Sequence, residues 1–283
     1  MNLKFSIITP VFNAAPTLEK TILSVLDQDF ESELEYIIID GGSTDGSLEI
    51  IDRYRDRISV VISEKDEGVY DAMNKGILNA TGDVIGIINS DDWYNTGALR
   101  TVETQFLKKQ DAEIVYSPVD TYFNGKPLIR FIPGSLENLN FKFTINHPSC
   151  FVKKSIYDRI GTFDLSYSIA ADYDFILRAY NADAKFYFVD PPLASYSLNG
   201  LSGKPLAKFE QIRQSWIIGS QYMSNMDRML QLKRRFFYLK WLFKEMVVFP
   251  MKPFLNPHLT RAIKKQFRLL LGGRLPSDSY GAW

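Results

Sequence analysis

Two adjacent carboxylates, Asp91 and Asp92, follow directly on the apolar, β-branched run 84–88. Like charges side by side repel, so either open water or a bound cation must offset the repulsion. The stretch "NSDD" supplies hard oxygen ligands, which suit Mg²⁺ or Mn²⁺ and not zinc. The alternative is that these residues only cap the next helix, because Ser and Asp favour N-cap positions. On residue types alone, both interpretations stay open.

A third carboxylate, Asp40, ends the apolar run "YIIID" at 36–40. In open parallel α/β sheets, ligands bind at the carboxyl ends of the strands, where Asp40 and Asp91 would both lie. The following segment "GGSTDGS" could cradle a phosphate, but it lacks the Lys of G-x-x-x-x-G-K-[ST] and the spacing of G-x-G-x-x-G. Its glycines are also what a tight turn into a helix needs, so a turn is the favoured interpretation.

The elements that must position these residues alternate along the first hundred residues. Apolar runs predict strands at 3–10 (ended by Pro10), 36–40, 58–62 and 84–88, and periodic patterns predict helices at 16–28, 47–56 and 69–80. Strands alternating with helices of about ten residues predict parallel βαβ units covered on both faces.

From residue 113 the pattern becomes mixed. We expect strands near 114–116, 119–123, 127–132, 149–153 and 185–190, a helix at 172–182, and a loop rich in Pro, Gly and Ser at 191–205. The remainder is expected to be helical. The prediction is therefore one α/β domain over 1–205, with halves 1–112 and 113–205, and a helical extension over 206–283.

The bulk composition is that of a folded protein with a large core, since 283 residues contain 46% hydrophobic and 23% charged residues. The one cysteine, Cys150, excludes an internal disulfide and is expected to be a core residue in a reducing compartment. No signal peptide and no apolar run of about 18–20 residues is visible. We therefore expect a cytoplasmic protein.

A net charge of zero hides a strong asymmetry. The segment 228–274 contains twelve Lys and Arg and one acidic residue, Glu245, so it carries +11 and the remainder −11. Its apolar residues Leu232, Phe236, Leu239 and Phe243 recur at helical spacing, which is typical of a helix lying on an anionic membrane surface. The alternatives are packing or oligomer contacts, and a nucleic acid, for which no recognition motif is present. We expect the membrane surface and no nucleic acid.

Four segments together resemble the family 2 glycosyltransferases. They are "SIITPVFNAAPTLEKTILSVLDQ", "YIIIDGGSTDGS", "SEKDEGVYDAMNKGILNATGDVIGIINSDDWY" and "HPSCFVKKSIYDRIGTFDLSYSIAADYDFILR", and they cover roughly residues 3–200. The resemblance implies the GT-A fold, a Rossmann-like nucleotide-binding mixed sheet flanked by helices, and an inverting, nucleotide-sugar-dependent enzyme. It is closest to bacterial enzymes that build O-antigen, capsule or exopolysaccharide.

The resemblance also implies roles for individual residues. Nucleotide-sugar binding falls to Thr9, Pro10, Phe12, Asn13, Asp40 (to the base), Asp66 (near the base or ribose), Asn89 and Ser90, metal binding to Asp91 with Asp92 in support, and catalysis to Asp172 as the base. The stretch 89–91 occupies the place of the family's D-x-D motif, with Asn at its first acidic position. Ala171 stands where many relatives have Glu, and "SYSLNGLSG" lacks a His that some relatives direct to the metal.

The chemistry of sugar transfer agrees with these roles. A departing nucleoside diphosphate needs its growing charge neutralised, which Mg²⁺ or Mn²⁺ at Asp91 would do. The incoming hydroxyl needs a base, and one carboxylate, Asp172, suffices for direct displacement with inversion. The sequence marks no obvious nucleophile for a retaining route. The alternative for Asp172 is a helix N-cap.

The expected function is transfer of a hexose from a nucleotide sugar, a UDP-sugar above all, to a polyprenyl-pyrophosphate-linked glycan at the inner face of the cell membrane. A nucleotidyltransferase that forms sugar nucleotides and an inactive membrane-bound GT-A scaffold are the alternatives. His147 has two interpretations, an acceptor contact or a hydrogen-bonded structural residue. The aromatic residues Trp93, Tyr94 and Tyr173 either stack on a sugar or belong to the core.

Overall fold

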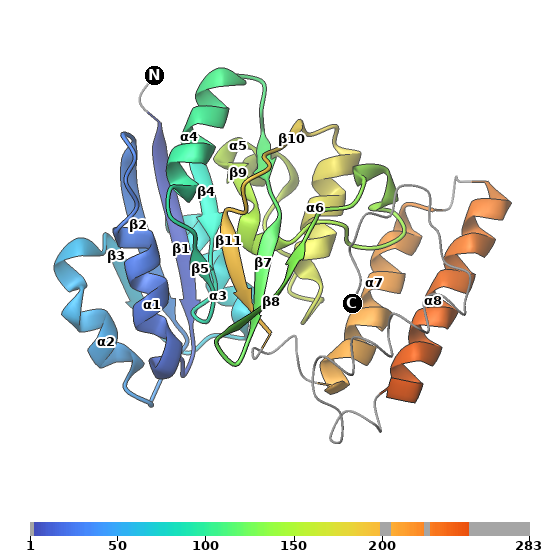
Figure 1. Cartoon of the computed structure of the whole chain (residues 1–283), viewed down its shortest axis with the longest axis horizontal. Helices are drawn as coiled ribbons and strands as arrows, with labels where there is room; N and C mark the ends of the chain where they lie inside the picture. Colours follow the sequence, from blue (N-terminus) through green and yellow to red (C-terminus); the bar gives the residue numbers. More distant parts are fainter. Residues whose placement is uncertain (1–2, 199–204, 224–226, 249–283) are drawn as a thin grey trace.

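The computed structural model describes residues 3–198, 205–223 and 227–248 of the chain (Figure 1). A seven-stranded sheet with the order β10-β6-β9-β4-β1-β2-β3 forms its centre. The strands of this sheet are β1 (Lys4–Val11), β2 (Glu33–Asp40), β3 (Val60–Ser63), β4 (Val84–Ile87), β6 (Ile114–Tyr116), β9 (Phe151–Lys153) and β10 (Phe186–Phe188). Strands β1 to β4 are parallel to their neighbours in this group, as predicted.

Helices cover both faces of this sheet. They are α1 (Ala15–Leu26), α2 (Ser47–Arg53), α3 (Val69–Asn79), α4 (Ala98–Lys108), α5 (Lys154–Ile160) and α6 (Ala171–Asn181). Alternate residues of β1 divide between two buried clusters, Phe5 and Ile7 with α1, α2 and α4, and Ile8 with α3, α5 and α6. This division is the period-two alternation of a strand buried on both sides. Short 3₁₀ turns lie at Arg55–Arg57, Leu136–Asn138 and His147–Ser149.

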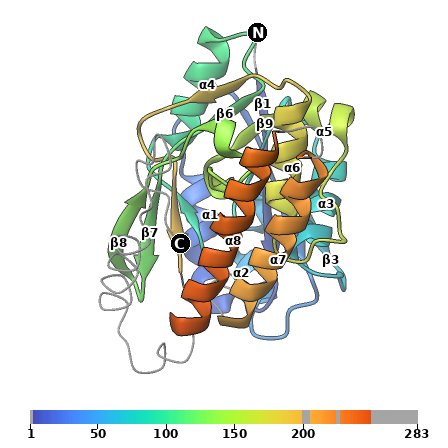
Figure 2. The same cartoon turned by 90° about the vertical axis from the view of Figure 1, so that its right-hand side faces the viewer.

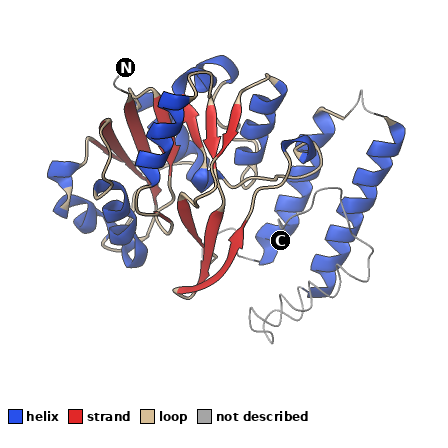
Figure 3. Ribbon diagram, turned by 45° about the horizontal axis from the view of Figure 1, so that its top comes forward, coloured by secondary structure: helices blue, strands red, loops and turns tan. Residues whose placement is uncertain are grey.

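The sheet is mixed, because β9 runs antiparallel between β4 and β6. A second, four-stranded sheet has the order β5-β11-β7-β8 and its β7–β8 hairpin projects from the body (Figure 3). Its strands are β5 (Trp93–Tyr94), β7 (Val119–Phe123), β8 (Lys126–Phe131) and β11 (Ala194–Ser197). The predicted α/β architecture with a mixed, helix-flanked sheet is confirmed.

Two local predictions are wrong. Pro10 does not end the first strand, which continues to Val11 beside β2. The Ile8 carbonyl accepts from the Ile88 N–H, so the backbone groups of Ile8 point toward β4. Because strand residues alternate in direction, the backbone groups of Pro10, two residues later, point toward β4 as well. Because β4 ends at Ile87, the missing N–H of Pro10 leaves no ladder bond unmade. The predicted loop 191–205 contains β11, which pairs with β7.

The chain beyond 205 is helical where the structure describes it, with α7 (Pro205–Gln221) and α8 (Arg228–Val248). Helix α7 packs between α6 and α8 (Figures 1 and 2). Ile218 of α7 belongs to the same buried cluster as Leu139 and Tyr173. Within the described ranges, no helix combines the length and apolarity that a membrane span requires. The part of the basic segment at 249–274 lies outside the described residues.

Candidate active site

The carboxyl ends of β1, β2 and β4 lie side by side and bring the predicted binding residues to one edge of the sheet. In the register of the parallel strands, Val11 lies beside Asp40 and Ile8 beside Ile87. The residues that follow each strand, from Phe12, Gly41 and Asn89 onward, therefore leave the sheet at the same edge.

The loops after β1 and β2 are joined through Asn13. Its backbone N–H donates to Ser43 Oγ at 2.8 Å, and its side-chain Oδ1 accepts from the Thr44 N–H at 2.9 Å. Asn13 adopts φ 48°, a left-handed conformation that Asn tolerates better than most residues. The bonds fix the β1 loop against the "GGSTDGS" turn, which is a turn into α2, as the favoured interpretation expects.

Asp40 organises that turn from inside the protein. Its side chain is fully buried and accepts from the backbone N–H groups of Gly42 and Ser43, and from Ser63 Oγ at 2.7 Å. These donors come from the turn after β2 and from the end of β3. A direct contact between Asp40 and a base stays a prediction.

Asp66 lies directly over the same turn. A Cβ atom placed on Gly41 would overlap the Asp66 carboxylate, so the two residues approach closely. The Gly68 N–H donates to Asp66 Oδ1 at 3.0 Å and fixes the side chain at the start of α3. Asp40 and Asp66 thus converge on one short stretch of backbone, as expected if both serve one nucleotide.

The other predicted nucleotide residues of β1 differ in accessibility. Thr9 is fully buried and shares a hydrogen bond of 3.0 Å with the Tyr36 hydroxyl, and Pro10 is buried as well. Phe12 is 61% exposed at the edge of the sheet, which is unusual for a large aromatic side chain. Phe12, the first residue after β1, therefore presents an exposed aromatic ring at this edge.

The residues after β4 form a turn closed by the Asp92 N–H donating to the Asn89 carbonyl at 3.0 Å. Asp92 is fully buried, and its two carboxylate oxygens accept from the Ser197 N–H and from Asn89 Nδ2. Burial, followed by the charge of Asp91, raises the pKa of Asp92 well above its usual range. Asp92 links this turn to β11, which fits support better than direct ligation.

Asp91 differs from its neighbour, because within the described part of the chain its carboxyl has no hydrogen bond or ion pair with another residue, only one with its own backbone. Burial raises the pKa of this half-buried carboxyl. Asn89 Oδ1 is buried and also lacks a partner there. A carboxylate and an unpaired amide oxygen two residues apart fit a hard divalent cation, which needs few protein ligands when phosphates complete its shell. No group of three or more His, Cys, Asp and Glu side chains arranged for a metal occurs in the described ranges.

Asp172 lies in the first turn of α6 and faces α3. The Tyr70 hydroxyl donates to Asp172 Oδ1 at 3.1 Å, and the Tyr173 N–H donates to the same oxygen at 2.8 Å. Burial raises the pKa of Asp172 to about 6, although both hydrogen bonds oppose this. Tyr70 lies in the first turn of α3, which follows the carboxyl end of β3, so the bond brings Asp172 to the same edge of the sheet as Asp40 and Asp91.

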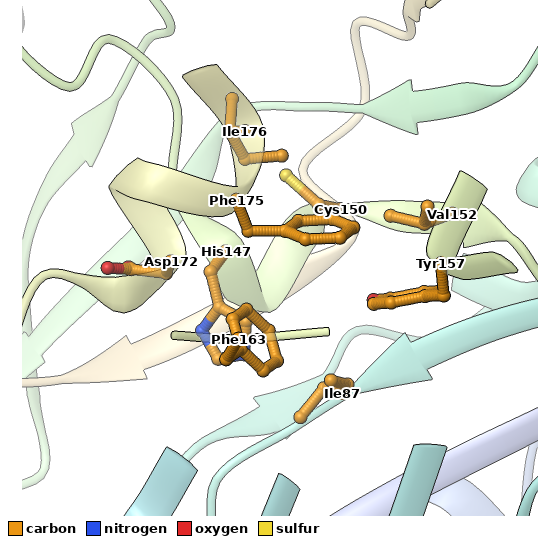
Figure 4. Close-up of a pocket in the computed structure, with 9 residues that line it drawn as sticks. All are labelled: Ile87, His147, Cys150, Val152, Tyr157, Phe163, Asp172, Phe175 and Ile176. Carbon is orange, nitrogen blue, oxygen red and sulfur yellow. The ribbon is translucent and has the colours of Figure 1, made fainter. Parts of the chain in front are cut away.

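Asp172 borders a small, mostly apolar pocket (Figure 4). The pocket is lined by Ile87, His147, Cys150, Val152, Tyr157, Phe163, Asp172, Phe175 and Ile176. Figure 4 shows the Asp172 carboxylate directed away from the rings of Phe163 and Phe175. Cys150 is buried, and burial raises its pKa, as expected of a core thiol. Burial lowers the pKa of His147 to about 4, and its Nε2 has no partner within the described residues.

The N-cap interpretation of Asp172 does not fit the geometry, because the N-cap of α6 is Ala170. The carbonyl oxygen of the Gln214 side chain, on α7, instead accepts from the N–H groups of Ile169 and Ala170 at 3.1 and 3.2 Å. Sequence reasoning missed both Gln214 and Tyr70. Tyr70 could have been found, because a residue in the first turn of a helix that follows a parallel strand lies near the ligand-binding edge.

The aromatic candidates also separate. Tyr94 is 3% and Tyr173 1% exposed, and the Tyr173 hydroxyl donates to the Leu139 carbonyl, so both belong to the core. Trp93 is half-buried, 4.8 Å from Tyr122 between ring centroids, with Lys20 Nζ 2.9 Å from its ring centroid. The Lys20 cation therefore covers one face of the Trp93 ring.

The chain shows clear similarity to known proteins. The family model described as "Glycosyl transferase family 2" matches residues 6–163, more than half of the chain. The "PGL/p-HBAD biosynthesis glycosyltransferase" of Mycobacterium bovis is 31% identical over 207 residues, covering 70% of this chain and 78% of that protein.

Solved structures agree on the fold. S. aureus TarS 1-349 in complex with UDP-GlcNAc superposes with a TM-score of 0.66 at 16% identity, covering 94% of this chain and 80% of that one. A longer structure of S. aureus TarS gives a TM-score of 0.64 at 18% identity. The match covers 85% of this chain and 44% of the TarS chain. The mannosyltransferase PcManGT of Pyrobaculum calidifontis, in complex with GDP-Man and Mn²⁺, gives 0.65 at 13% identity, covering 96% and 81%. The chain therefore belongs to glycosyl transferase family 2 and is a glycosyltransferase with the GT-A fold.

Proposed function

We propose that this glycosyltransferase moves a hexose from a nucleotide sugar to a lipid-linked glycan of a bacterial surface polysaccharide, with inversion at the anomeric carbon. The observation that carries the proposal is the Asp172 carboxylate, held by Tyr70 at the ligand-binding edge with its pKa raised to about 6. A base with a pKa near the working pH is ionised yet still basic enough to accept the proton of an acceptor hydroxyl. The carboxylate needs no second catalytic carboxyl for a direct displacement.

The nucleotide would bind where Phe12, Asp40 and Asp66 meet. The exposed ring of Phe12 offers a stacking face, and Asp66 lies over Gly41 with its Oδ2 nearest to the turn, while its Oδ1 accepts from the Gly68 N–H. Asp40, which already holds the turn, would support this site from beneath. The UDP-GlcNAc bound by TarS makes a UDP-sugar the first donor to test.

Asp91 and Asn89 would hold Mg²⁺ or Mn²⁺ beside the donor's pyrophosphate. When bound, the cation would take up negative charge as the nucleoside diphosphate leaves. The Mn²⁺ in the PcManGT complex supports the choice of a hard divalent ion. The buried, engaged Asp92 would fix the turn that presents these ligands.

A panel of UDP- and GDP-linked hexoses tests the proposal, with release of nucleoside diphosphate measured with and without a chelator. We expect turnover that needs added Mg²⁺ or Mn²⁺ and that falls about 10²–10⁴-fold in Asp172→Asn, the usual loss for a general base. The variant Asp91→Asn should bind metal more weakly in direct titration. Unimpaired turnover in Asp172→Asn would remove the base assignment, and full turnover under chelation would remove the metal. Release of pyrophosphate would point instead to a nucleotidyltransferase.

The lipid-linked acceptor and the membrane location belong to the same proposal. A polyprenyl chain confines its glycan to the bilayer surface, and the +11 charge of 228–274 would favour the anionic inner face. Transfer assays with a short-chain, water-soluble pyrophosphate acceptor test this part separately from donor turnover. If only free sugars in solution are glycosylated, the lipid-linked acceptor is wrong while the donor chemistry stands.

A further inference from the structure

Helix α8 buries two charged side chains against the rest of the protein and exposes a row of large apolar side chains. The face toward α7 carries Arg234 and Glu245, each 2% exposed, and Tyr238 at 5%. The outward face carries six large apolar side chains that are between 54% and 62% exposed: Met229, Leu232, Phe236, Leu239, Phe243 and Met246. A helix packed only for stability would show the reverse distribution.

The inward face is held by specific contacts, so the orientation of α8 is not a chance arrangement. Arg234 donates to Ser220 Oγ at 2.8 Å and to the carbonyls of Ser215 and Trp216 at 3.0 and 2.8 Å. Its guanidinium lies 4.6 Å from the ring centroid of Trp216 and 4.8 Å from that of Tyr238. Such a buried guanidinium fixes the rotation of α8 about its own axis.

The outward residues follow one another at intervals of three and four positions, which places them in a single stripe along the helix. The same spacing would suit a coiled coil with a second copy of the chain. In that arrangement, the positions flanking the stripe would face each other across the interface. They carry Arg228, Lys233, Arg235 and Lys240 and no acidic residue, so a second copy would bring like charges together.

An apolar stripe bordered by cations matches a surface that is apolar inside and anionic outside. We propose that the stripe of α8 is a membrane-docking face, on which Leu and Phe side chains enter the headgroup boundary and the flanking cations meet anionic lipid headgroups. This deepens the proposed function, since it assigns the membrane contact to one face of one described helix. The helix lies in the plane of the bilayer surface and does not cross it.

A matched pair of double variants tests the docking face in the full-length protein. Leu232→Gln with Leu239→Gln changes two stripe residues that are 57% and 62% exposed. Leu78→Gln with Leu107→Gln changes two exposed leucines, 76% and 49%, on helices α3 and α4. Co-sedimentation uses sucrose-loaded vesicles of phosphatidylcholine, alone or mixed with phosphatidylglycerol, and circular dichroism melts check the fold.

We expect the wild-type protein and the α3/α4 control to bind the mixed vesicles alike, and the stripe variant to bind about tenfold or more weakly. Lys233→Gln with Arg235→Gln should weaken binding about 25-fold on the anionic vesicles alone, because each cation contributes about fivefold there. Equal binding by the stripe variant and the wild type would overturn the proposal. So would a wild-type dimer in light scattering that the stripe variant dissociates, since a second copy would then cover the face.

These outcomes are independent of the proposed chemistry. Nucleoside diphosphate release from a soluble donor should be the same in the stripe variant and the wild type, because α8 supplies no residue to the candidate active site. A wild-type protein that turns over the donor but does not bind the vesicles would refute only the docking face. Vesicle binding by a protein that turns over no nucleotide sugar would refute only the proposed function.

Discussion

Replacing Asp172 by Asn should make the protein both much less active and more stable. Folding raises the pKa of this carboxyl from about 3.8 to about 6 because burial disfavours its charged form. Each pKa unit corresponds to about 1.36 kcal/mol, so the ionised carboxylate costs the folded state up to about 3 kcal/mol. Asn is neutral, and its side-chain oxygen can still accept from Tyr70 and from the Tyr173 N–H.

The sign of the effect depends on pH. Below about 3.8 the carboxyl is protonated in both the folded and the unfolded chain, so it imposes no penalty. The penalty grows as pH rises from about 3.8, where the unfolded chain loses the proton, to the folded pKa of about 6, and it is complete above that value. Because Asp172 is half-buried, we expect a gain for Asp172→Asn of about 1–3 kcal/mol at pH 8, shifting Tm upward by about 2–10 °C.

Thermal and urea melts of wild type and Asp172→Asn, at pH 8 and near pH 4.5, measure this difference. Asp158→Asn is the matched control, since Asp158 is an exposed carboxylate on the neighbouring helix α5 and should change stability by less than about 0.5 kcal/mol. A gain for Asp172→Asn that is equal at both pH values would show that its cause is not the buried charge. A variant that is no more stable at pH 8 would refute the reasoning from burial.

Three further variants probe the residues around the site. Tyr70→Phe removes a hydrogen-bond donor that lowers the pKa of Asp172. Such a bond is worth about 1.5 kcal/mol, so the acidic limb of the kcat/KM profile should move to higher pH by about one unit. An unmoved limb would show that Tyr70 does not tune the base. Gly41→Ala should displace the Asp66 carboxylate and raise the donor Kd about tenfold in calorimetry, whereas an unchanged Kd would place Asp66 outside the nucleotide site. Gln214→Ala leaves the N–H groups of Ile169 and Ala170 without their acceptor and should lower the free energy of unfolding by about 1–3 kcal/mol in urea melts. We also expect a lower kcat with little change in the donor Kd. A wild-type kcat would mean that α7 does not position the base.

The part of the fold that the sequence predicted well is the part governed by local pattern. Strands β1, β2 and β4 are buried on both faces and therefore read as continuous apolar runs. The predicted helix at 69–80 matches α3 because its buried residues recur at helical spacing. Because those strands are parallel neighbours, their order also predicts that Asp40 and Asp91 share one edge.

The missing parts depend on contacts between distant residues. Strand β11 has little apolar pattern of its own, and it forms because β7, more than 70 residues earlier, offers a parallel partner. The hydrogen bond between Tyr70 and Asp172 spans 102 positions. No periodicity or spacing within either segment carries information about the other, so the sequence predicted a base but not what tunes it.

The same contacts bear on the predicted boundary at residue 205. Gln214 of α7 accepts from the backbone at the start of α6, where Asp172 lies, and Ile218 of α7 packs in the cluster that contains Tyr173. Arg234 of α8 in turn donates to carbonyls of α7. The three helices therefore form a continuous series of buried contacts from α8 to the first turn of α6, which carries Asp172. Helix α7 packs with the α/β domain, because its removal would leave the N–H groups of Ile169 and Ala170, which lead into α6, without their side-chain acceptor.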